Sequence, residues 1–199
     1  ATADLGHAVQ RQGDLERAGT LHAEALAIAR QIDDQEAIGW SLNNLGAVAS
    51  AQGDYVEAEA LLNENLAIAR NLGDDAQVAS ALTELGNVAF YRGDLEGARA
   101  RFQESLDLFR AIGDDAQTAN ALNNLGSVAA DQGSFAAAEV LLNEALHLRR
   151  GIGDKKGIAD GLNNLAETVR LQGDLTRARD LFRESLRVTH EIGDRLTSA

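Results

Sequence analysis

The sequence predicts an all-α fold, a solenoid of about five antiparallel helix pairs. Three observations support this class: the chain repeats itself every 40 residues, each repeat has the apolar spacing of helices and none of strands, and Pro is absent from all 199 residues. Without Pro, long uninterrupted helices are favoured. The repeat is visible where one residue type recurs in a single register: Gly13, Gly53, Gly93, Gly133 and Gly173; Ala18, Ala58, Ala98, Ala138 and Ala178; Leu26, Leu66, Leu106, Leu146 and Leu186.

Each repeat is predicted to contain two helices, as the second one shows. Its first helix is expected from about Glu36 to Gln52, and its second helix ends at about Leu72. A Gly-Asp pair ends each helix and begins the next, because Gly adopts the left-handed conformation past a helix end and Asp is a preferred N-cap. We expect a single repeat domain over 1–199, with incomplete first and last units; the units are 1–33, 34–73, 74–113, 114–153 and 154–193.

Glycine also recurs inside the first helices, at Gly6, Gly46, Gly86 and Gly126. Each such Gly costs about 1 kcal/mol relative to Ala. We expect the offset to be a close approach of the two helices of a pair, with each Gly facing the small Ala58-type residue of its partner helix. Cations in the last turn of the second helices, such as Arg30, suit the helix dipole.

The polar residues show no pattern of a metal or catalytic site. The Asp33-Asp34, Asp74-Asp75 and Asp114-Asp115 pairs are interpreted as helix caps because they recur in register. Cys is absent, and the four His residues lack metal-ligand spacing. The Gly residues around Gly153 follow no strand and form no phosphate loop. We therefore expect no cofactor, no metal and no enzymatic activity.

The net charge of −13 disfavours nucleic acid and anionic membranes as partners. Residues 1–100 carry 6 Lys and Arg against 16 Asp and Glu, a net of −10, while residues 101–199 carry 12 against 15, a net of −3. A partner is therefore expected to be basic or neutral. No apolar run is long enough to span a bilayer, and a cytoplasmic location is expected.

The spacing of Leu42, Leu45, Gly46, Gly53, Ala58 and Leu66 resembles the tetratricopeptide repeat, and Phe102 and Phe182 match the large residue of its second helix. The family's terminal Pro is missing, and Ala49 stands where an aromatic residue is usual. HEAT and armadillo repeats have a similar length but do not explain the Leu-Gly and Gly-Asp spacing. The 40-residue unit, longer than the usual ~34 residues, resembles the repeats of kinesin light chains, of spindle-orientation scaffolds and of bacterial regulators.

This resemblance implies a right-handed superhelix whose first helices line a concave groove that binds a protein or peptide. The Asn pairs of these helices have two interpretations. Their amides either form hydrogen bonds with a bound peptide or brace neighbouring helices. The aromatic residues near this face are expected either to anchor a partner or to pack against the next repeat; they are Trp40, Phe90 and Tyr91. The candidate groove residues are Trp40, Asn43, Asn44, Thr83, Asn87, Phe90, Asn120, Asn123, Asn124, Asn163, Asn164 and Arg170.

Two functions follow as expectations from the resemblance. The first is a protein-interaction module that binds a peptide or partner segment in its groove. The alternative is a sensor segment of a larger bacterial signalling or transcription regulator that binds a signal peptide or a small effector. Leu181, Phe182 and Leu186 of the last second helix are expected to lie uncovered, so that the chain either continues or self-associates through this end.

Overall fold

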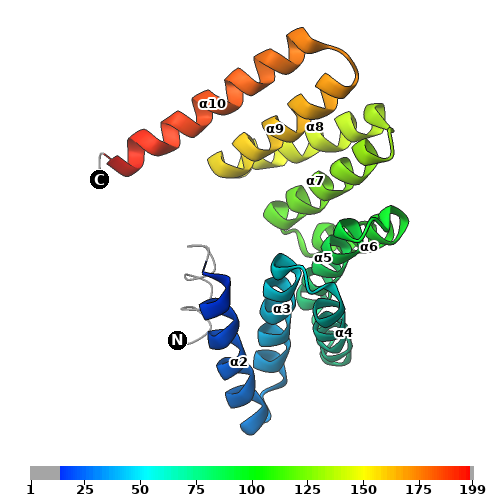
Figure 1. Ribbon diagram of the computed structural model, residues 1–199, viewed down its shortest axis with the longest axis vertical. Helices are drawn as coiled ribbons and strands as arrows, with labels where there is room; N and C mark the ends of the chain where they lie inside the picture. The colour runs from blue at the N-terminus through cyan, green and yellow to red at the C-terminus, as the bar shows by residue number, and fades with distance from the viewer. Residues whose placement is uncertain (1–13, 198–199) are drawn as a thin grey trace. The chain divides into compact units, whose positions relative to one another are not determined.

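The computed structural model describes residues 14–197, with side chains described to residue 193. Within that range it contains nine α-helices and no strand, which confirms the all-α class (Figure 1). Gly6 and Gly13, and the first helix expected for the first repeat, lie outside the described residues. The helices are α2 (Leu15–Gln31), α3 (Gln35–Gln52), α4 (Tyr55–Leu72), α5 (Asp75–Tyr91), α6 (Leu95–Ile112), α7 (Asp115–Asp131), α8 (Phe135–Ile152), α9 (Lys155–Leu171) and α10 (Leu175–Thr197).

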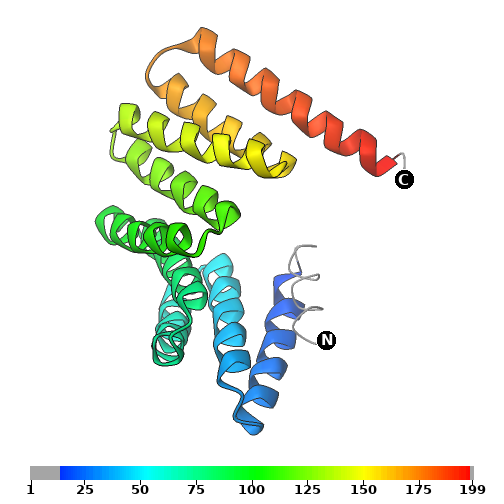
Figure 2. The ribbon, with the colours of Figure 1, turned by 180° about the vertical axis from the view of Figure 1, so that it is seen from behind.

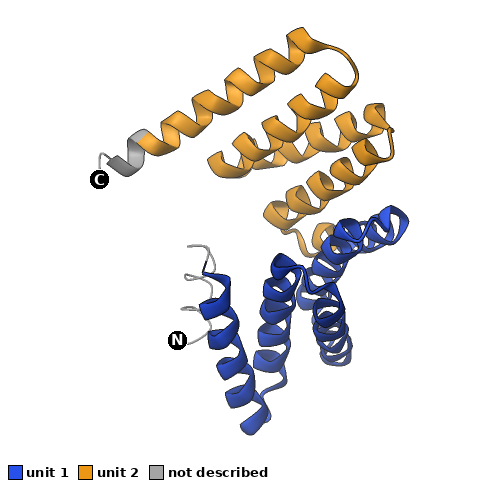
Figure 3. Cartoon of the chain, viewed as in Figure 1, with its two compact units in different colours: residues 1–108 blue, residues 109–199 orange. Residues whose placement is uncertain are grey.

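The chain forms two compact units, residues 1–108 and 109–199 (Figure 3). In the first unit α2 packs against α3, α3 against α4 and α4 against α5, and α3 also contacts α5. In the second unit α7 packs against α8, α8 against α9 and α9 against α10, and α7 also contacts α9. The hairpin of α9 and α10 is visible from both sides (Figures 1 and 2). Each unit is therefore a series of adjacent helix pairs in which the first helices of consecutive repeats lie side by side.

The helix ends use the predicted Gly and Asp residues. Seven Gly residues between helices have positive φ angles from 69° to 94°, the left-handed region that ends a helix. Asp side chains then accept the amide N–H three residues later, at distances from 2.9 to 3.1 Å; these caps are Asp14, Asp34, Asp54, Asp74, Asp94, Asp114, Asp154 and Asp174. The interpretation of Asp34, Asp74 and Asp114 as caps is thus confirmed.

The glycines inside the first helices permit the expected close approach, but the partner differs from the expectation. A Cβ placed on Gly46 would lie 2.5 Å from the Leu62 side chain. On Gly86 it would lie 2.5 Å from Phe102, and on Gly126 2.7 Å from Leu142. The facing residue is therefore the large one a turn beyond the Ala58-type residue, because long helical side chains lean towards the helix N-terminus.

Four Arg–Glu ion pairs join consecutive second helices, and we call them the Arg–Glu ladder. In each pair the Arg in the last turn of one second helix bonds a Glu 34 residues later, with N···O distances from 2.5 to 3.1 Å; the pairs are Arg30–Glu64, Arg70–Glu104, Arg110–Glu144 and Arg150–Glu184. All of these side chains are about half exposed, so each pair stabilises the fold by no more than about 1 kcal/mol.

No helix within the described part of the chain is long and apolar enough to cross a membrane. At α10, Leu186 is 59% exposed, whereas Leu106 and Leu146, its equivalents in earlier repeats, are each 2% exposed. Leu181 and Phe182 are partly buried against the core of the second unit.

Candidate functional site

The predicted groove residues of the first unit lie on α3 and α5 and differ in exposure. Trp40 is 47% exposed, while Asn44 is buried. Asn43 is partly buried, and its Oδ1 accepts a hydrogen bond of 3.2 Å from the buried Asn65 amide of α4. Likewise, the Thr83 hydroxyl on α5 forms a hydrogen bond of 2.7 Å with the Ser105 hydroxyl on α6. Asn43 and Thr83 thus connect first and second helices.

In the second unit, one Asn of each pair joins two first helices. The Nδ2 of Asn164 on α9 donates to the Oδ1 of Asn123 on α7 at 2.9 Å. This bond bridges consecutive repeats, as the bracing interpretation expects. Asn163 is exposed and Asn124 is partly buried.

Arg170 and Asn120 are also exposed and interact with neighbouring side chains. Arg170 forms two hydrogen bonds with Glu167, of 2.6 and 2.7 Å. This pairing lowers the pKa of Glu167 and raises that of Arg170. Asn120 donates to Gln117 and accepts from Arg149 at 3.0 Å.

Arg149 was not predicted as a notable residue, although it is the buried cation of this region. Its guanidinium donates to the Gly157 carbonyl at 2.5 Å as well as to Asn120. Desolvation lowers the pKa of Arg149, and the nearby Asp154 and Asp160 act in the opposite direction. A Cβ on Gly157 would lie 2.8 Å from Arg149. The sequence signal was a charged residue at a position that is uncharged in the other repeats, where it is Ala29, Ala69, Phe109 and Thr189.

The first unit contains a pocket with a volume of about 400 Å³ between the C-terminal halves of α3 and α5, which we call the tyrosine pocket. The Tyr55 and Tyr91 rings stack with centroids 6.3 Å apart and an interplanar angle of 13°. Phe90 meets Tyr91 edge to face at 5.8 Å. The lining residues are Ala47, Ser50, Ala51, Tyr55, Glu84, Asn87 and Tyr91.

The polar side of the tyrosine pocket is formed by Glu84 and Asn87. The Asn87 amide donates to a carboxylate oxygen of Glu84 at 3.2 Å. Desolvation raises the pKa of Glu84, and this hydrogen bond partly offsets the rise. Of the predicted aromatic residues, Tyr91 lines the pocket and Phe90 packs on its ring, but Trp40 is not among the lining residues.

The sequence-based prediction missed Tyr55 and Glu84 as pocket residues. Tyr55 is the first residue of a second helix, and the same position in the other repeats is held by Leu15, Leu95, Phe135 and Leu175. The available signal was a hydroxyl group at a position that is otherwise apolar. Which first-helix residues it meets depends on how the next repeat packs, and the periodicity of a single helix does not contain that information.

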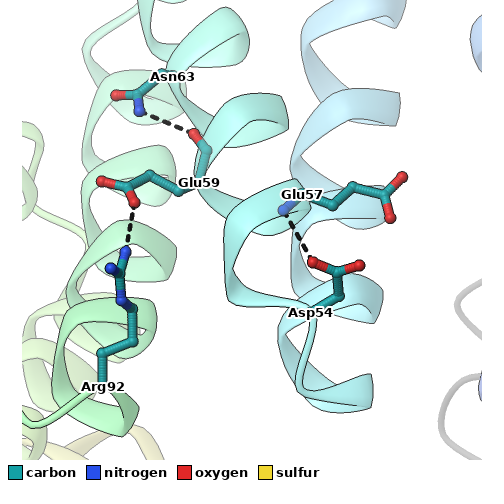
Figure 4. Close-up of polar contacts among 5 residues, drawn as sticks. All are labelled: Asp54, Glu57, Glu59, Asn63 and Arg92. Atoms are coloured by element: carbon teal, nitrogen blue, oxygen red, sulfur yellow. Dashed lines mark hydrogen bonds and ion pairs between the residues drawn. The ribbon is translucent and has the colours of Figure 1, made fainter.

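Figure 4 shows a second polar cluster of the first unit, at the start of α4. Arg92 bonds Glu59 at 2.7 Å, and the Asn63 amide donates to the Glu59 carbonyl at 2.8 Å. Asp54 caps α4 through the N–H of Glu57. Arg92 and Glu59 thus neutralise each other, and the Asp54 cap ends on a backbone N–H, so we interpret these contacts as structural. Among the described residues, no three His, Cys, Asp or Glu side chains gather as a metal site.

Comparison with known proteins identifies similar repeats and folds. A family profile described as "Tetratricopeptide repeat" matches residues 1–71, 77–151 and 117–191. A comparison with curated protein sequences found no significant match.

Three solved structures share the fold at low sequence identity. BtubC (BKLC) from P. vanneervenii has a TM-score of 0.80 at 21% identity, over 96% of this chain and 80% of that one. The apo form of RapI has a TM-score of 0.81 at 16% identity, over 99% of this chain and 72% of that one. A signal transduction ATPase with numerous domains and a tetratricopeptide repeat sensor, PH0952 from Pyrococcus horikoshii, has a TM-score of 0.75 at 18% identity. That match covers 95% of this chain but only 30% of the ATPase.

Proposed function

Because the chain belongs to the tetratricopeptide repeat family, we propose that it is a protein-interaction module that binds a peptide or partner segment along the first helices of its repeats. The repeat fold is of a scaffold type, and its family members bind protein or peptide partners. The observation that carries the proposal is the tyrosine pocket, because a concave site lined by aromatic and polar side chains is typical of ligand binding.

The proposed contacts follow from exposure. Trp40, Asn163 and Arg170 present exposed side chains on first helices, so they are assigned to the partner. The Asn residues whose amides already bond neighbouring helices are assigned to bracing; these are Asn43, Asn120, Asn123 and Asn164. The acidic first hundred residues favour a partner that is basic or neutral.

Peptide display followed by photo-crosslinking tests this function. Peptides are selected from a random library against the whole chain, and a benzophenone amino acid is then placed at Trp40 or Asn163. The matched control positions, Glu57 and Val140, are exposed on second helices. Crosslinks are expected from the first-helix positions. If no peptide is selected, or if crosslinks form only from Glu57 and Val140, the proposed function is wrong.

A sensor or regulatory segment of a larger bacterial regulator is the second candidate. The observation that favours it is the similarity to a segment covering 30% of an ATPase described as having a tetratricopeptide repeat sensor. A sensor changes its conformation when its ligand binds. Small-angle scattering with and without the selected peptide separates the two functions, because only a sensor requires a change in the radius of gyration.

A further inference from the structure

We propose that the tyrosine pocket receives an arginine side chain of the bound partner. This inference rests on the proposed function, since it assigns one specificity-determining contact of the peptide. It goes beyond that function by naming the chemistry of the anchor and the residues that recognise it, Glu84 and the Tyr55–Tyr91 pair.

The first argument is charge. Glu84 is the charged residue among those that line the pocket, and the partner described for its carboxylate is the neutral amide of Asn87. The two first helices beside it, α3 and α5, contain no Lys, Arg or His. A partly buried carboxylate that no cation of these helices neutralises is stabilised when a cation arrives from outside.

The second argument is shape. The rings of Tyr55 and Tyr91 are nearly parallel, and Tyr91 is 64% exposed. A guanidinium is planar, stacks on aromatic faces and pairs with a carboxylate through two N–H groups. A lysine ammonium lacks this planar fork, so arginine fits a site that combines a carboxylate with stacked rings. Ala47, Ser50 and Ala51 leave room for the alkyl chain.

The third argument comes from the equivalent position in the second unit. There Phe135 and Leu171 replace the two tyrosines, and Asn164 replaces Glu84. The carboxylate of that set is Glu167, at the position of Asn87, and it is already paired with Arg170. Asn164 already donates its amide to Asn123. The repeat scaffold therefore does not require this carboxylate or these hydroxylated rings, and their presence together in the first unit points to a ligand.

The first part of the chain also suits a basic ligand as a whole. Residues 1–100 carry a net charge of −10. Such a field attracts a cationic segment and repels an acidic one, and it acts mainly on the rate of association.

The test uses the whole chain and three acetylated, amidated tripeptides: Ala-Arg-Ala, Ala-Lys-Ala and Ala-norleucine-Ala. Binding is followed by NMR titration of the Glu84 carboxyl and the Tyr55 and Tyr91 ring signals. The arginine peptide is expected to shift these signals, with the lysine peptide weaker and the norleucine peptide without effect. Because the bound cation stabilises the carboxylate, saturation with the arginine peptide is also expected to lower the pKa of Glu84.

Two variants and a matched control distinguish binding in the tyrosine pocket from attraction by the net negative charge of the chain. Glu84→Gln keeps the shape, removes the carboxylate and is expected to weaken the arginine peptide by about tenfold or more, as for a charged hydrogen bond. Tyr91→Leu removes an exposed ring and is expected to weaken the affinity for the arginine peptide several-fold. Glu36→Gln removes one exposed carboxylate at the opposite end of α3 and should change the affinity by less than about twofold.

The proposal is overturned if the arginine and norleucine peptides shift the pocket signals equally, or if Glu84→Gln binds as tightly as the unmodified chain. If peptides selected by display still crosslink to the first helices in that case, only the arginine anchor is wrong. If no selected peptide binds either, the proposed function fails together with it.

Discussion

Asp33 occupies the position that glycine holds at Gly73, Gly113 and Gly153. Its φ of 55° lies in the left-handed region, and it is the non-glycine residue with positive φ in the described chain. A side chain in this region is disfavoured because Cβ approaches the following carbonyl oxygen, although Asp tolerates it better than most residues. Its carboxylate accepts an exposed hydrogen bond from Gln35 at 2.8 Å. Because the other repeats have Gly at this position, the exception at Asp33 is visible in the sequence alone.

Asp33→Gly is expected to stabilise the chain by about 1 kcal/mol, because the strain removed exceeds the value of one exposed hydrogen bond. Urea denaturation followed by circular dichroism measures the change. The reciprocal variant Gly113→Asp introduces the same strain and should destabilise the chain by a similar amount. An unchanged or lower midpoint for Asp33→Gly would show that the Gln35 bond outweighs the strain.

The contacts of the asparagine pairs divide them between two roles, bracing of neighbouring helices and binding of a partner. Asn123→Ala is expected to cost about 0.5–1.5 kcal/mol of stability, because it removes the acceptor for Asn164. Asn163→Ala is expected to leave the unfolding midpoint unchanged, since its side chain is exposed, and to weaken a bound peptide. Equal losses of stability in the two variants would contradict this division. Denaturation curves and fluorescence anisotropy with a selected peptide measure the two effects.

Glu84 makes the stability of the chain depend on pH in a defined direction. Its pKa in the folded state is raised from the ordinary value of 4.5, chiefly by desolvation. A raised folded-state pKa favours folding while the carboxyl is protonated, and this contribution is lost as the pH rises through the folded pKa. Glu84→Gln should therefore be stabilised relative to the unmodified chain, increasingly so as the pH rises above the ordinary value of 4.5 and through the folded-state pKa. Thermal melts over a series of pH values check this, and a constant difference between the two chains would contradict it.

At the scale of the helix, the first and second helices of a repeat are held together by the large side chain that each interior glycine admits. The sequence predicted that a close approach must offset the cost of these glycines, which is correct. The nearest neighbour is the large residue and not the Ala58-type residue, although the Ala138 carbonyl does lie 3.5 Å from a Cβ added at Gly126. Register fixes which residues recur and not which way a side chain leans across the interface. The same limit explains why Tyr55 and Arg149 were missed.

Gly126→Ala tests this contact against a matched glycine in the same unit. The new Cβ would lie 2.7 Å from Leu142, so a loss of about 1–3 kcal/mol is expected from overpacking, although Ala is the better helix former. Gly151 lies in α8 with no neighbour within 4 Å of an added Cβ, and Gly151→Ala should gain about 0.5–1 kcal/mol. Chemical denaturation of both variants gives the comparison. A gain at both positions would mean that Leu142 moves aside without cost.

At the scale of the whole molecule, repetition made the fold predictable from one sequence. Five aligned copies identify the helix pairs, their ends and their caps, because each local signal appears several times in the same register. The candidate site was less predictable for the opposite reason. The residues that differ between copies carry the specificity, and a single occurrence of Tyr55 or Glu84 has no second copy to support it.

The net charge of −13 predicts the response of the whole chain to salt. Between about 10 mM and about 100 mM NaCl the Debye length falls from about 30 Å to about 10 Å. Screening then reduces the repulsion among the excess carboxylates more than it weakens the exposed pairs of the Arg–Glu ladder. The melting temperature should therefore rise with salt. A fall in melting temperature with salt would show that the ion pairs dominate.

Glu104→Gln, which breaks one pair of the ladder, should change the free energy of unfolding by less than about 1 kcal/mol.

The Arg–Glu ladder has a consequence for changes in the number of repeats. Each second helix from α4 to α8 carries both the Glu that accepts the preceding Arg and, six residues later, the Arg that reaches the following Glu. Duplicating or deleting any 40-residue stretch of this part of the gene therefore restores a complete set of partners at the new junction. Recombination between copies can lengthen or shorten the array without leaving an Arg or a Glu unpaired, whereas an insertion whose length is not a multiple of 40 residues would break the pairing at its boundaries.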